Sequence, residues 1–162
     1  HLQRLIEDLL VAAREDLVAF PVRREPLDLA DLLVSVVEAY APRVEAEGRI
    51  LQLQLQTVPL PIRGDPTRLR QILGNLLENA MRYSRPGETI RVLGGRGERV
   101  VVEICGGMLG AGGSGLGLGW TIVEDLMRGH GGSVEFLEGA EGALHVRLIF
   151  PLDAPSPISA QI

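Results

Sequence analysis

The sequence feature that most constrains the fold is a segment of ten residues, GAGGSGLGLG, at positions 110–119. Glycine loses more backbone entropy on folding than any other residue, so this density indicates either a flexible linker or a close approach of the backbone to a ligand. A flexible linker does not explain why Leu116 and Leu118 alternate with glycines, as anchored residues would. The segment leads into a predicted helix, whose first N–H groups favour an anion. We therefore expect an anion-binding loop at this helix start.

Hydrophobic periodicity and turn residues predict the other elements. Apolar residues recur at spacings of three and four over 1–20, which is typical of an amphipathic helix. This helix either packs on the core of the same domain or forms half of a dimerising helical hairpin. The run ILQLQLQT at 50–57 alternates apolar and polar residues, as in a half-buried strand. Asp65 followed by Pro66 predicts the start of a helix over 65–84.

The order of the predicted elements indicates the fold class. Prolines at 59 and 61 are expected to end the strand before them, and a glycine-rich loop at 94–97 is expected to join two strands. The further elements are a short strand at 23–29, a helix ending near 47, strands at 88–93 and 98–105, a helix at 116–128, strands at 133–137 and 143–150, and a loose tail from Pro151. This order predicts an α/β (α+β) fold, a two-layer sandwich of a mixed sheet with helices on one face.

The predicted helix over 65–84 carries an unusual polar side. Asn75 and Asn79 lie one turn apart in mid-helix, where each asparagine costs roughly 0.5 kcal/mol or more against alanine. Glu78 and Arg82 fall on the same side, with Tyr83 at its edge. Such a side could simply be solvated, but an amide oxygen can ligate a hard cation and arginine can neutralise phosphate. We therefore expect this set to bind a magnesium-bound nucleotide.

Charge and composition exclude several function classes. The formal net charge of -5 argues against a nucleic-acid surface or an anionic-membrane surface, so neither partner is expected. All 16 basic residues are arginine, which excludes a P-loop lysine, and the single Cys105 excludes an intrachain disulfide or a multi-cysteine metal site. The sequence shows neither a signal peptide nor a membrane-spanning apolar run, so a reduced, cytoplasmic compartment is expected.

The glycine segment also fits a dinucleotide-binding fingerprint. Residues 110–115 match G-x-G-x-x-G between a predicted strand and a predicted helix, and Glu135 follows about 20 residues later. The dinucleotide fold, however, places this fingerprint in repeated parallel βαβ units. Hairpins are predicted on both sides of the segment here, so dinucleotide binding is the weaker alternative.

Three sequence blocks, taken in order, resemble one known family. The block GDPTRLRQILGNLLENAMRYS at 64–84 resembles the N box of sensor histidine kinases with its lead-in. The block GSGLGLGWTIVEDLMRGHGGSVEF at 113–136 resembles their G2 box with the following helix and strand, and RLIEDLL at 4–10 resembles the end of the second dimerisation helix. Over about residues 1–150 the chain is similar to the ATP-binding catalytic domain of these kinases, grouped with gyrase, Hsp90 and MutL ATPases. The resemblance implies a Bergerat-type ATP-binding fold preceded by a helix from a dimerisation hairpin.

The resemblance also implies roles for individual residues toward ATP and Mg²⁺. Asn79 would ligate Mg²⁺, while Asn75 and Arg82 would lie near the phosphates and Tyr83 near the adenine. Glu78 occupies the acidic position at which some relatives place a general base. Two glycines, Gly115 and Gly117, would direct their backbone N–H groups to the phosphates. The residues of the glycine-rich segment that would bind ATP are Gly113, Ser114, Gly115, Leu116, Gly117 and Leu118.

For the whole protein, the resemblance implies a two-component sensor histidine kinase. The γ-phosphate of Mg-ATP would pass to a histidine outside this chain and then to an aspartate of a response regulator receiver domain. Residues 1–20 would end the dimerisation hairpin of a homodimer, 21–151 would form the catalytic domain, and 152–162 would be a flexible tail. The chain alone would not autophosphorylate and would make no direct membrane contact, whereas the full-length protein could be anchored in the inner membrane.

The chain departs from the family pattern on the adenine side of the site. Where the G1 box should begin with an aspartate, the sequence reads Cys105-Gly106-Gly107, and cysteine cannot replace a carboxylate acceptor. Only Met108 and Leu109 precede Gly110, where the family has a long lid. None of the three histidines resembles a phospho-acceptor site, and two of them, His130 and His145, are expected to be structural.

Two explanations account for these departures. The protein could be a degenerate relative, deficient in ATP binding, that acts as a dimerisation or docking module. Alternatively, the chain could omit a stretch near 105–110 that includes a lid. The intact N box and G2 box favour the second explanation, because a dead site would not need to keep them.

Overall fold

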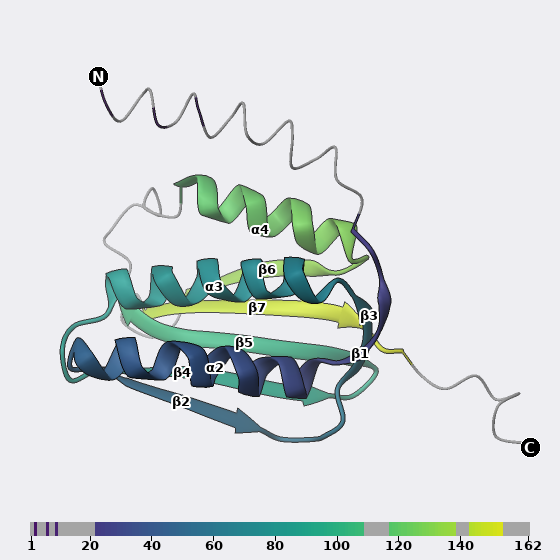
Figure 1. The fold of residues 1–162 in the computed structure, drawn as a ribbon, viewed down its shortest axis with the longest axis horizontal. Helices are drawn as coiled ribbons and strands as arrows, with labels where there is room; N and C mark the ends of the chain where they lie inside the picture. Colours follow the sequence, from purple (N-terminus) through teal and green to yellow (C-terminus); the bar gives the residue numbers. More distant parts are fainter. Residues whose placement is uncertain are drawn as a thin grey trace, which may run out of the picture.

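Three helices cover one face of a five-stranded mixed sheet in the computed structural model, which describes residues 22–108, 117–138 and 143–153 together with residues 2, 6 and 9 (Figure 1). Two strands at one edge of the sheet are parallel to each other, and all other neighbouring pairs are antiparallel. From edge to edge the strands are β2 (Ile50–Leu55), β4 (Thr89–Arg96), β5 (Arg99–Met108), β7 (Ala143–Pro151) and β6 (Ser133–Glu138). This arrangement confirms the predicted two-layer α+β sandwich.

The core lies between the sheet and the helices and is almost wholly aliphatic. Successive side chains of a strand point to opposite faces, so Val100, Val102 and Ile104 of β5 are at most 1% exposed beneath the helices. The covering helices are α2 (Leu29–Ala46), α3 (Pro66–Tyr83) and α4 (Gly117–Gly129). The opposite side of the sheet, which we call the open face, carries polar residues such as Glu103 and His145.

Aspartate caps begin α2 and α3. The Oδ1 atom of Asp65 accepts hydrogen bonds from the backbone N–H groups of Thr67 and Arg68 at 3.1 and 3.3 Å. The Oδ1 atom of Asp28 accepts one from Ala30 at 2.9 Å. Each cap satisfies N–H groups that the first helical turn leaves free, which explains why these helices begin where they do. The predicted start of the 65–84 helix is confirmed.

One strand was not predicted. β3 (Pro61–Gly64) pairs antiparallel with β1 (Glu25–Asp28) in a separate two-stranded sheet. The prolines at 59 and 61 were expected to end a strand, whereas Pro61 begins one. Proline lacks a backbone N–H but is tolerated as the first residue of a strand, so its presence was weak evidence for a loop.

The glycine-rich loop predicted at 94–97 is largely a strand. β4 continues through Gly94 and Gly95 and ends at Arg96. A Cβ atom on Gly94 would lie 2.9 Å from Leu55 Cδ2 and 3.1 Å from Leu60 Cδ1. Gly94 therefore permits close packing of the strand against the core, and the prediction of a loop at these two glycines was wrong.

The two ends of the chain are described only in part. At residues 2, 6 and 9 the backbone is helical, and these apolar side chains are 75%, 49% and 68% exposed, so at these three positions they do not pack on the described core. Pro151 lies in β7, and the Asp153 N–H donates to the Pro61 carbonyl at 3.0 Å, so the loose tail does not begin at Pro151 as expected. Residues 154–162 lie outside the described residues. Among the described helices, none combines the length and the apolar character that crossing a membrane requires.

Candidate functional site

The side chain of Asn79 lies between α3 and the first turn of α4. It is 8% exposed, and its Nδ2 atom has no hydrogen-bond partner among the described residues. A Cβ atom on Gly119 would lie 3.9 Å from this Nδ2, so the amide faces the start of α4. A buried polar group without a partner is costly, and native proteins rarely leave one unsatisfied. This donor is therefore a candidate contact for a ligand.

The start of α4 supplies the second part of the site. Its first three residues are Gly117, Leu118 and Gly119, so the end of the glycine segment forms the start of the helix predicted over 116–128. The first N–H groups of a helix have no partner within the helix, and the helix dipole makes this end favourable for an anion. The predicted phosphate contacts at Gly113, Ser114, Gly115 and Leu116 lie outside the described residues, as does the side chain of Leu118.

Glu78 faces away from α4. Both of its carboxylate oxygens pair with the Arg43 guanidinium on α2, with Arg43 Nη2 at 3.0 Å from Oε2. Arg70, which is also on α3, donates a hydrogen bond to the Ser35 hydroxyl of α2 at 3.0 Å. A general base at Glu78 would require its carboxylate to leave Arg43, and that role stays a prediction.

The polar residues of α3, which were expected to lie on a single side of the helix, thus lie on two separate sides. α3 lies between α2 and α4 (Figure 1), so residues only 100° apart around the helix meet different neighbours. Glu78 contacts α2, whereas Asn79 faces α4. Sequence periodicity could not separate these two sides, because it does not show where a neighbouring helix packs.

The other predicted residues of α3 lie near Asn79 in the helix. Asn75 is half-buried one turn earlier, Arg82 is exposed in the last turn, and Tyr83 is half-buried at the end. Asn75, Asn79 and Arg82 therefore follow one another along one side, at spacings of four and three residues. This stripe and the start of α4 are the two surfaces that could hold a ligand between them.

The end of β5 packs directly against the end of α3. Gly107 has φ +78°, and a Cβ atom there would lie 2.6 Å from the carbonyl carbon of Tyr83 and 2.8 Å from the nitrogen of Ser84. Only glycine tolerates both this backbone conformation and this approach. The pairing of β5 with β7 shifts register between Cys105 and Met108, which allows the close contact. The glycine pair is evident in the sequence, but its contact with α3 is not.

The missing carboxylate of the G1 box is not supplied by Cys105. In the register of the sheet, Cys105 lies opposite His145, and its side chain is on the open face. The sequence contains no aspartate or glutamate between Glu103 and Glu124, so no acid follows β5 directly. Both the structure and the sequence therefore indicate that the adenine side of the site differs from the family pattern.

His130 has a structural position, as expected. It is 1% exposed, its Nε2 accepts from the Asp65 N–H at 3.1 Å, and its Nδ1 lies 2.7 Å from the Leu126 carbonyl. These contacts assign the proton to Nδ1, which donates to Leu126. Burial lowers the pKa of His130 below its ordinary value, and the charge of Arg24 lowers it further. The hydrogen bond to the Leu126 backbone and the charge of Asp65 raise the pKa and partly oppose this shift. His130 thus joins the end of α4 to the start of α3.

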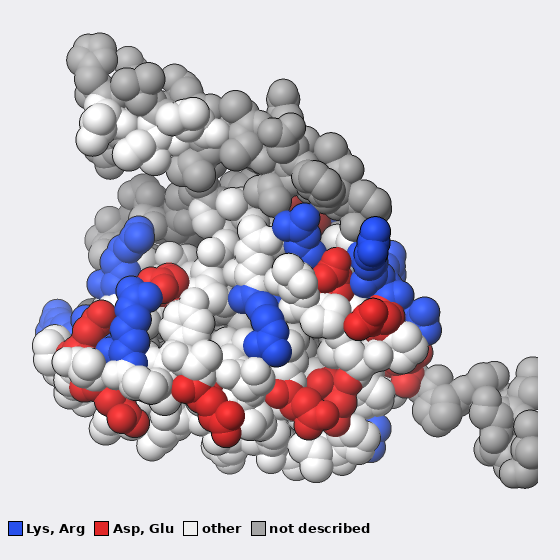
Figure 2. Space-filling view, viewed as in Figure 1, with Lys and Arg blue, Asp and Glu red and all other residues white. Residues whose placement is uncertain are grey.

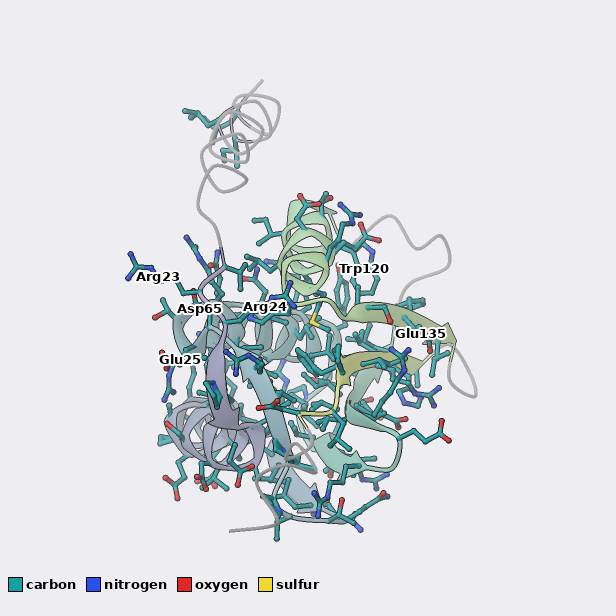
Figure 3. All side chains as sticks on the ribbon, turned by 90° about the vertical axis from the view of Figure 1, so that its right-hand side faces the viewer. Arg23, Arg24, Glu25, Asp65, Trp120 and Glu135 are labelled. Atoms are coloured by element: carbon teal, nitrogen blue, oxygen red, sulfur yellow. The ribbon has the colours of Figure 1, made fainter. Side chains whose placement is uncertain are left out.

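The N-terminal segment is attached at the same point. Asp65 Oδ2 accepts from the Arg23 N–H at 3.2 Å, and Figure 3 shows Arg23 and Arg24 beside Asp65. Across the described part of the face shown in Figure 2, acidic and basic side chains are interspersed over α2 and α3. The anion site is therefore expected to depend on local N–H groups and arginine and not on a broad positive surface.

Comparison with known proteins gives the class to which this fold and site belong. The family model described as "Histidine kinase-, DNA gyrase B-, and HSP90-like ATPase" matches residues 64–154, more than half of the chain. The signal transduction histidine-protein kinase BaeS of Escherichia coli (strain K12) is 26% identical over 176 residues, which cover 94% of this chain and 37% of BaeS. The probable sensor histidine kinase TcrY of Mycobacterium tuberculosis is 28% identical over 184 residues, covering 99% of this chain and 38% of TcrY.

A solved structure shows the same architecture. The Acinetobacter baumannii histidine kinase AdeS aligns with a TM-score of 0.72 and 21% identity, covering 94% of this chain and 79% of that chain. The chain belongs to the histidine kinase, DNA gyrase B and HSP90-like ATPase family, and its curated relatives are sensor histidine kinases. This confirms the resemblance to the ATP-binding domain of these kinases, and ATP is the nucleotide of the family. The chain spans little more than a third of the length of BaeS and TcrY.

Proposed function

We propose that this chain is the ATP-binding catalytic domain of a two-component sensor histidine kinase, with Mg-ATP bound between α3 and the start of α4. The observation that carries the proposal is the buried Nδ2 atom of Asn79, which lacks a partner among the described residues and faces the first turn of α4. Leaving such a donor unsatisfied costs roughly 1–3 kcal/mol, and a phosphate oxygen would satisfy it. The ATPase family match supports ATP as the nucleotide.

The residues of α3 that were predicted to bind nucleotide have the following roles in this proposal. The oxygen of the Asn79 amide would hold Mg²⁺, because hard cations prefer oxygen ligands. When bound, Mg²⁺ would neutralise charge on the phosphates. Asn75 and Arg82, on the same side of α3, would bind phosphate oxygens, and Tyr83 would contact the adenine.

The glycine segment would complete the phosphate site. Its members are Gly113, Ser114, Gly115, Leu116, Gly117 and Leu118, with backbone N–H groups directed at the phosphates. Glycine at 119 supports the proposal, because a side chain there would point toward the Asn79 amide. The segment could thus approach the phosphates without a steric barrier from α4.

We extend the proposal to the whole protein. The γ-phosphate would pass to a histidine outside this chain and then to a response regulator receiver domain. Residues 1–20 would end a dimerisation hairpin of a homodimer, 21–151 would form the catalytic domain, and 152–162 would form a tail. The chain would be cytoplasmic, and the full-length protein could be held at the inner membrane.

Titration calorimetry of the full chain with a magnesium-bound, non-hydrolysable ATP analogue tests the proposal. We expect saturable binding by the wild type and a loss of at least about 10-fold in affinity for Asn79→Ala, since a hydrogen bond to a charged group contributes roughly 1.5–3 kcal/mol. Gln52→Ala is the matched control, because it removes an exposed amide from β2 at the far edge of the sheet. This control should bind like the wild type.

The alternatives predict different results. Absence of ATP and ADP binding by the wild type would favour a degenerate docking module, which the lack of an acid after β5 makes the second candidate. Preferential binding of NAD would favour the hypothesis of a dinucleotide-binding domain. Equal affinity of wild type and Asn79→Ala would show that nucleotide binds elsewhere. Each of these results would rule out nucleotide binding at the proposed site.

A further inference from the structure

The open face of the sheet carries a cluster of potential metal ligands that the proposed nucleotide site does not use. Glu103 and Cys105 are two residues apart on β5, so their side chains point to the same face. His145 on β7 lies directly opposite Cys105 in the antiparallel register. The carboxylate, thiol and imidazole ligand atoms all lie within 4.8 Å of one another.

We propose that Glu103, Cys105 and His145 bind a divalent transition-metal ion, with Zn²⁺ as the best match. Zn²⁺ accepts thiolate, imidazole and carboxylate ligands at roughly 2.0–2.3 Å in tetrahedral geometry, which places the ligand atoms about 3–4 Å apart. Small side-chain rotations would bring the three atoms from their present separations to that distance. A thiol and an imidazole do not suit Mg²⁺ or Ca²⁺, which prefer oxygen, so this site differs in chemistry from the nucleotide site.

A second layer of contacts holds the carboxylate in position. Glu103 Oε2 lies 2.9 Å from His145 Nε2, while Glu103 Oε1 accepts from Arg147 Nε at 2.8 Å. Arg147 can therefore keep Oε1 while Oε2 turns to an ion. Arg147 Nη1 also lies 3.6 Å from the carboxylate of Glu135, so it keeps a second acidic partner on the open face, where Figure 3 shows Glu135 on the side of the sheet away from α2 and α3. Outer contacts of this kind orient metal ligands.

The cluster is accessible and offers two groups that can be anionic, next to Arg91 opposite Cys105 and Arg147 beside Glu103. The side chains of Glu103 and His145 are 22% and 25% exposed, and a depression lined in part by Leu93, Val101 and Glu103 adjoins the cluster. On binding, the ion would displace the thiol proton of Cys105 to solvent and bind one imidazole nitrogen, with the single ring hydrogen carried by the other nitrogen. The thiolate and the carboxylate together balance the two positive charges, and water would take the fourth position.

An ion at this site would join β5 to β7 next to the register shift. Cys105 is the last residue of the regular pairing, and Gly106 and Gly107 follow it. Because the ion would bind the folded chain and bridge two strands, it should raise the melting temperature as its concentration exceeds Kd. The effect requires no nucleotide, so it can be measured independently of the proposed ATP site.

Titration of the metal-free full chain with Co²⁺, without nucleotide, tests the proposal. We expect a thiolate-to-cobalt charge-transfer band that saturates at one ion per chain and disappears when Zn²⁺ is added. Cys105→Ser should abolish the band. His145→Ala and Glu103→Gln should each weaken binding at least about 10-fold, and the Zn²⁺-dependent rise in melting temperature should shrink in parallel.

Glu45→Gln is the matched control, because it changes an exposed carboxylate on α2, on the opposite side of the sheet from the three proposed ligands. Its metal affinity should remain within about threefold of the wild type, a smaller change than the loss expected for each ligand variant. Circular dichroism verifies that every variant is folded. A wild type without the band would overturn the proposal, and so would a band that His145→Ala and Glu103→Gln leave unchanged.

Discussion

Asn79 and Glu78 are adjacent in sequence but lie in different environments. The Asn79 amide is buried beside Gly119, whereas the Glu78 carboxylate pairs with the exposed Arg43. The composition of the helix indicated that mid-helix asparagines needed a functional reason. It could not indicate which asparagine was buried, because that depends on the position of α4, more than 30 residues away in sequence.

Gly107 provides a prediction at the scale of one residue. Alanine at this position would adopt φ +78° and would place Cβ 2.6 Å from the Tyr83 carbonyl carbon. We expect Gly107→Ala to lower the free energy of unfolding by about 1–2 kcal/mol for the backbone conformation and by about 1–3 kcal/mol more for the contact. Urea unfolding monitored by circular dichroism measures the loss.

A second glycine separates these two contributions. Gly87 has φ +89°, and a Cβ atom there would meet no other atom within 4 Å. Gly87→Ala should therefore show only the conformational loss of about 1–2 kcal/mol. If the two alanine variants were equally destabilised, the close contact between β5 and α3 would not contribute to stability.

At the scale of elements, local rules predicted most of the fold. The cap at Asp65 and the alternation over 50–57 identified α3 and β2, because both signals depend on residues close in sequence. The errors arose where a residue is chosen for a distant contact. Gly94 was assigned to a loop because its packing against Leu55 and Leu60 involves other parts of the chain. β3 was missed because a strand of four residues has little periodicity.

The Asp65 cap gives a prediction for α3 as an element. Asp65→Ala would remove the acceptor for the N–H groups of Thr67 and Arg68 and also for that of Arg23. We expect a loss of about 0.5–2 kcal/mol in the free energy of unfolding, measured by urea titration. Asp65→Asn is the matched control, because asparagine caps helices about as well as aspartate. Equal losses in both variants would mean that the charge of Asp65 or its second oxygen, which accepts from Arg23, matters more than the capping oxygen.

At the scale of the whole molecule, one buried histidine connects parts of the chain that are far apart in sequence. His130 at the end of α4 accepts from the N-cap residue of α3, and its ring makes an edge-to-face contact with Phe150 of β7 at 6.4 Å between centroids. The two helices that flank Asn79 are thus held together at their other ends. A structural histidine could be predicted from the sequence, but its partners could not, because they lie 65 residues earlier and 20 residues later in the chain.

This arrangement makes stability depend on pH in a defined window. Burial lowers the pKa of His130 from its ordinary 6.5, with Arg24 acting in the same direction and Leu126 and Asp65 opposing. Between the lowered pKa and 6.5 the unfolded chain binds more protons than the folded chain, so stability rises with pH. Protonation would also place a hydrogen on Nε2, where the Asp65 N–H already donates.

We therefore expect the free energy of unfolding to fall as pH is lowered from about 7.5 to about 5.5, by at most about 1.4 kcal/mol per pH unit. Urea titrations across this range measure the slope, and they stay above the pH at which most carboxylates titrate. His130→Gln keeps an oxygen able to accept from the Asp65 N–H but has no proton to gain, so its stability should be lower at neutral pH and nearly independent of pH within the window. A slope as steep in His130→Gln as in the wild type would show that another group causes it, and the link between α3 and α4 would then be independent of proton binding.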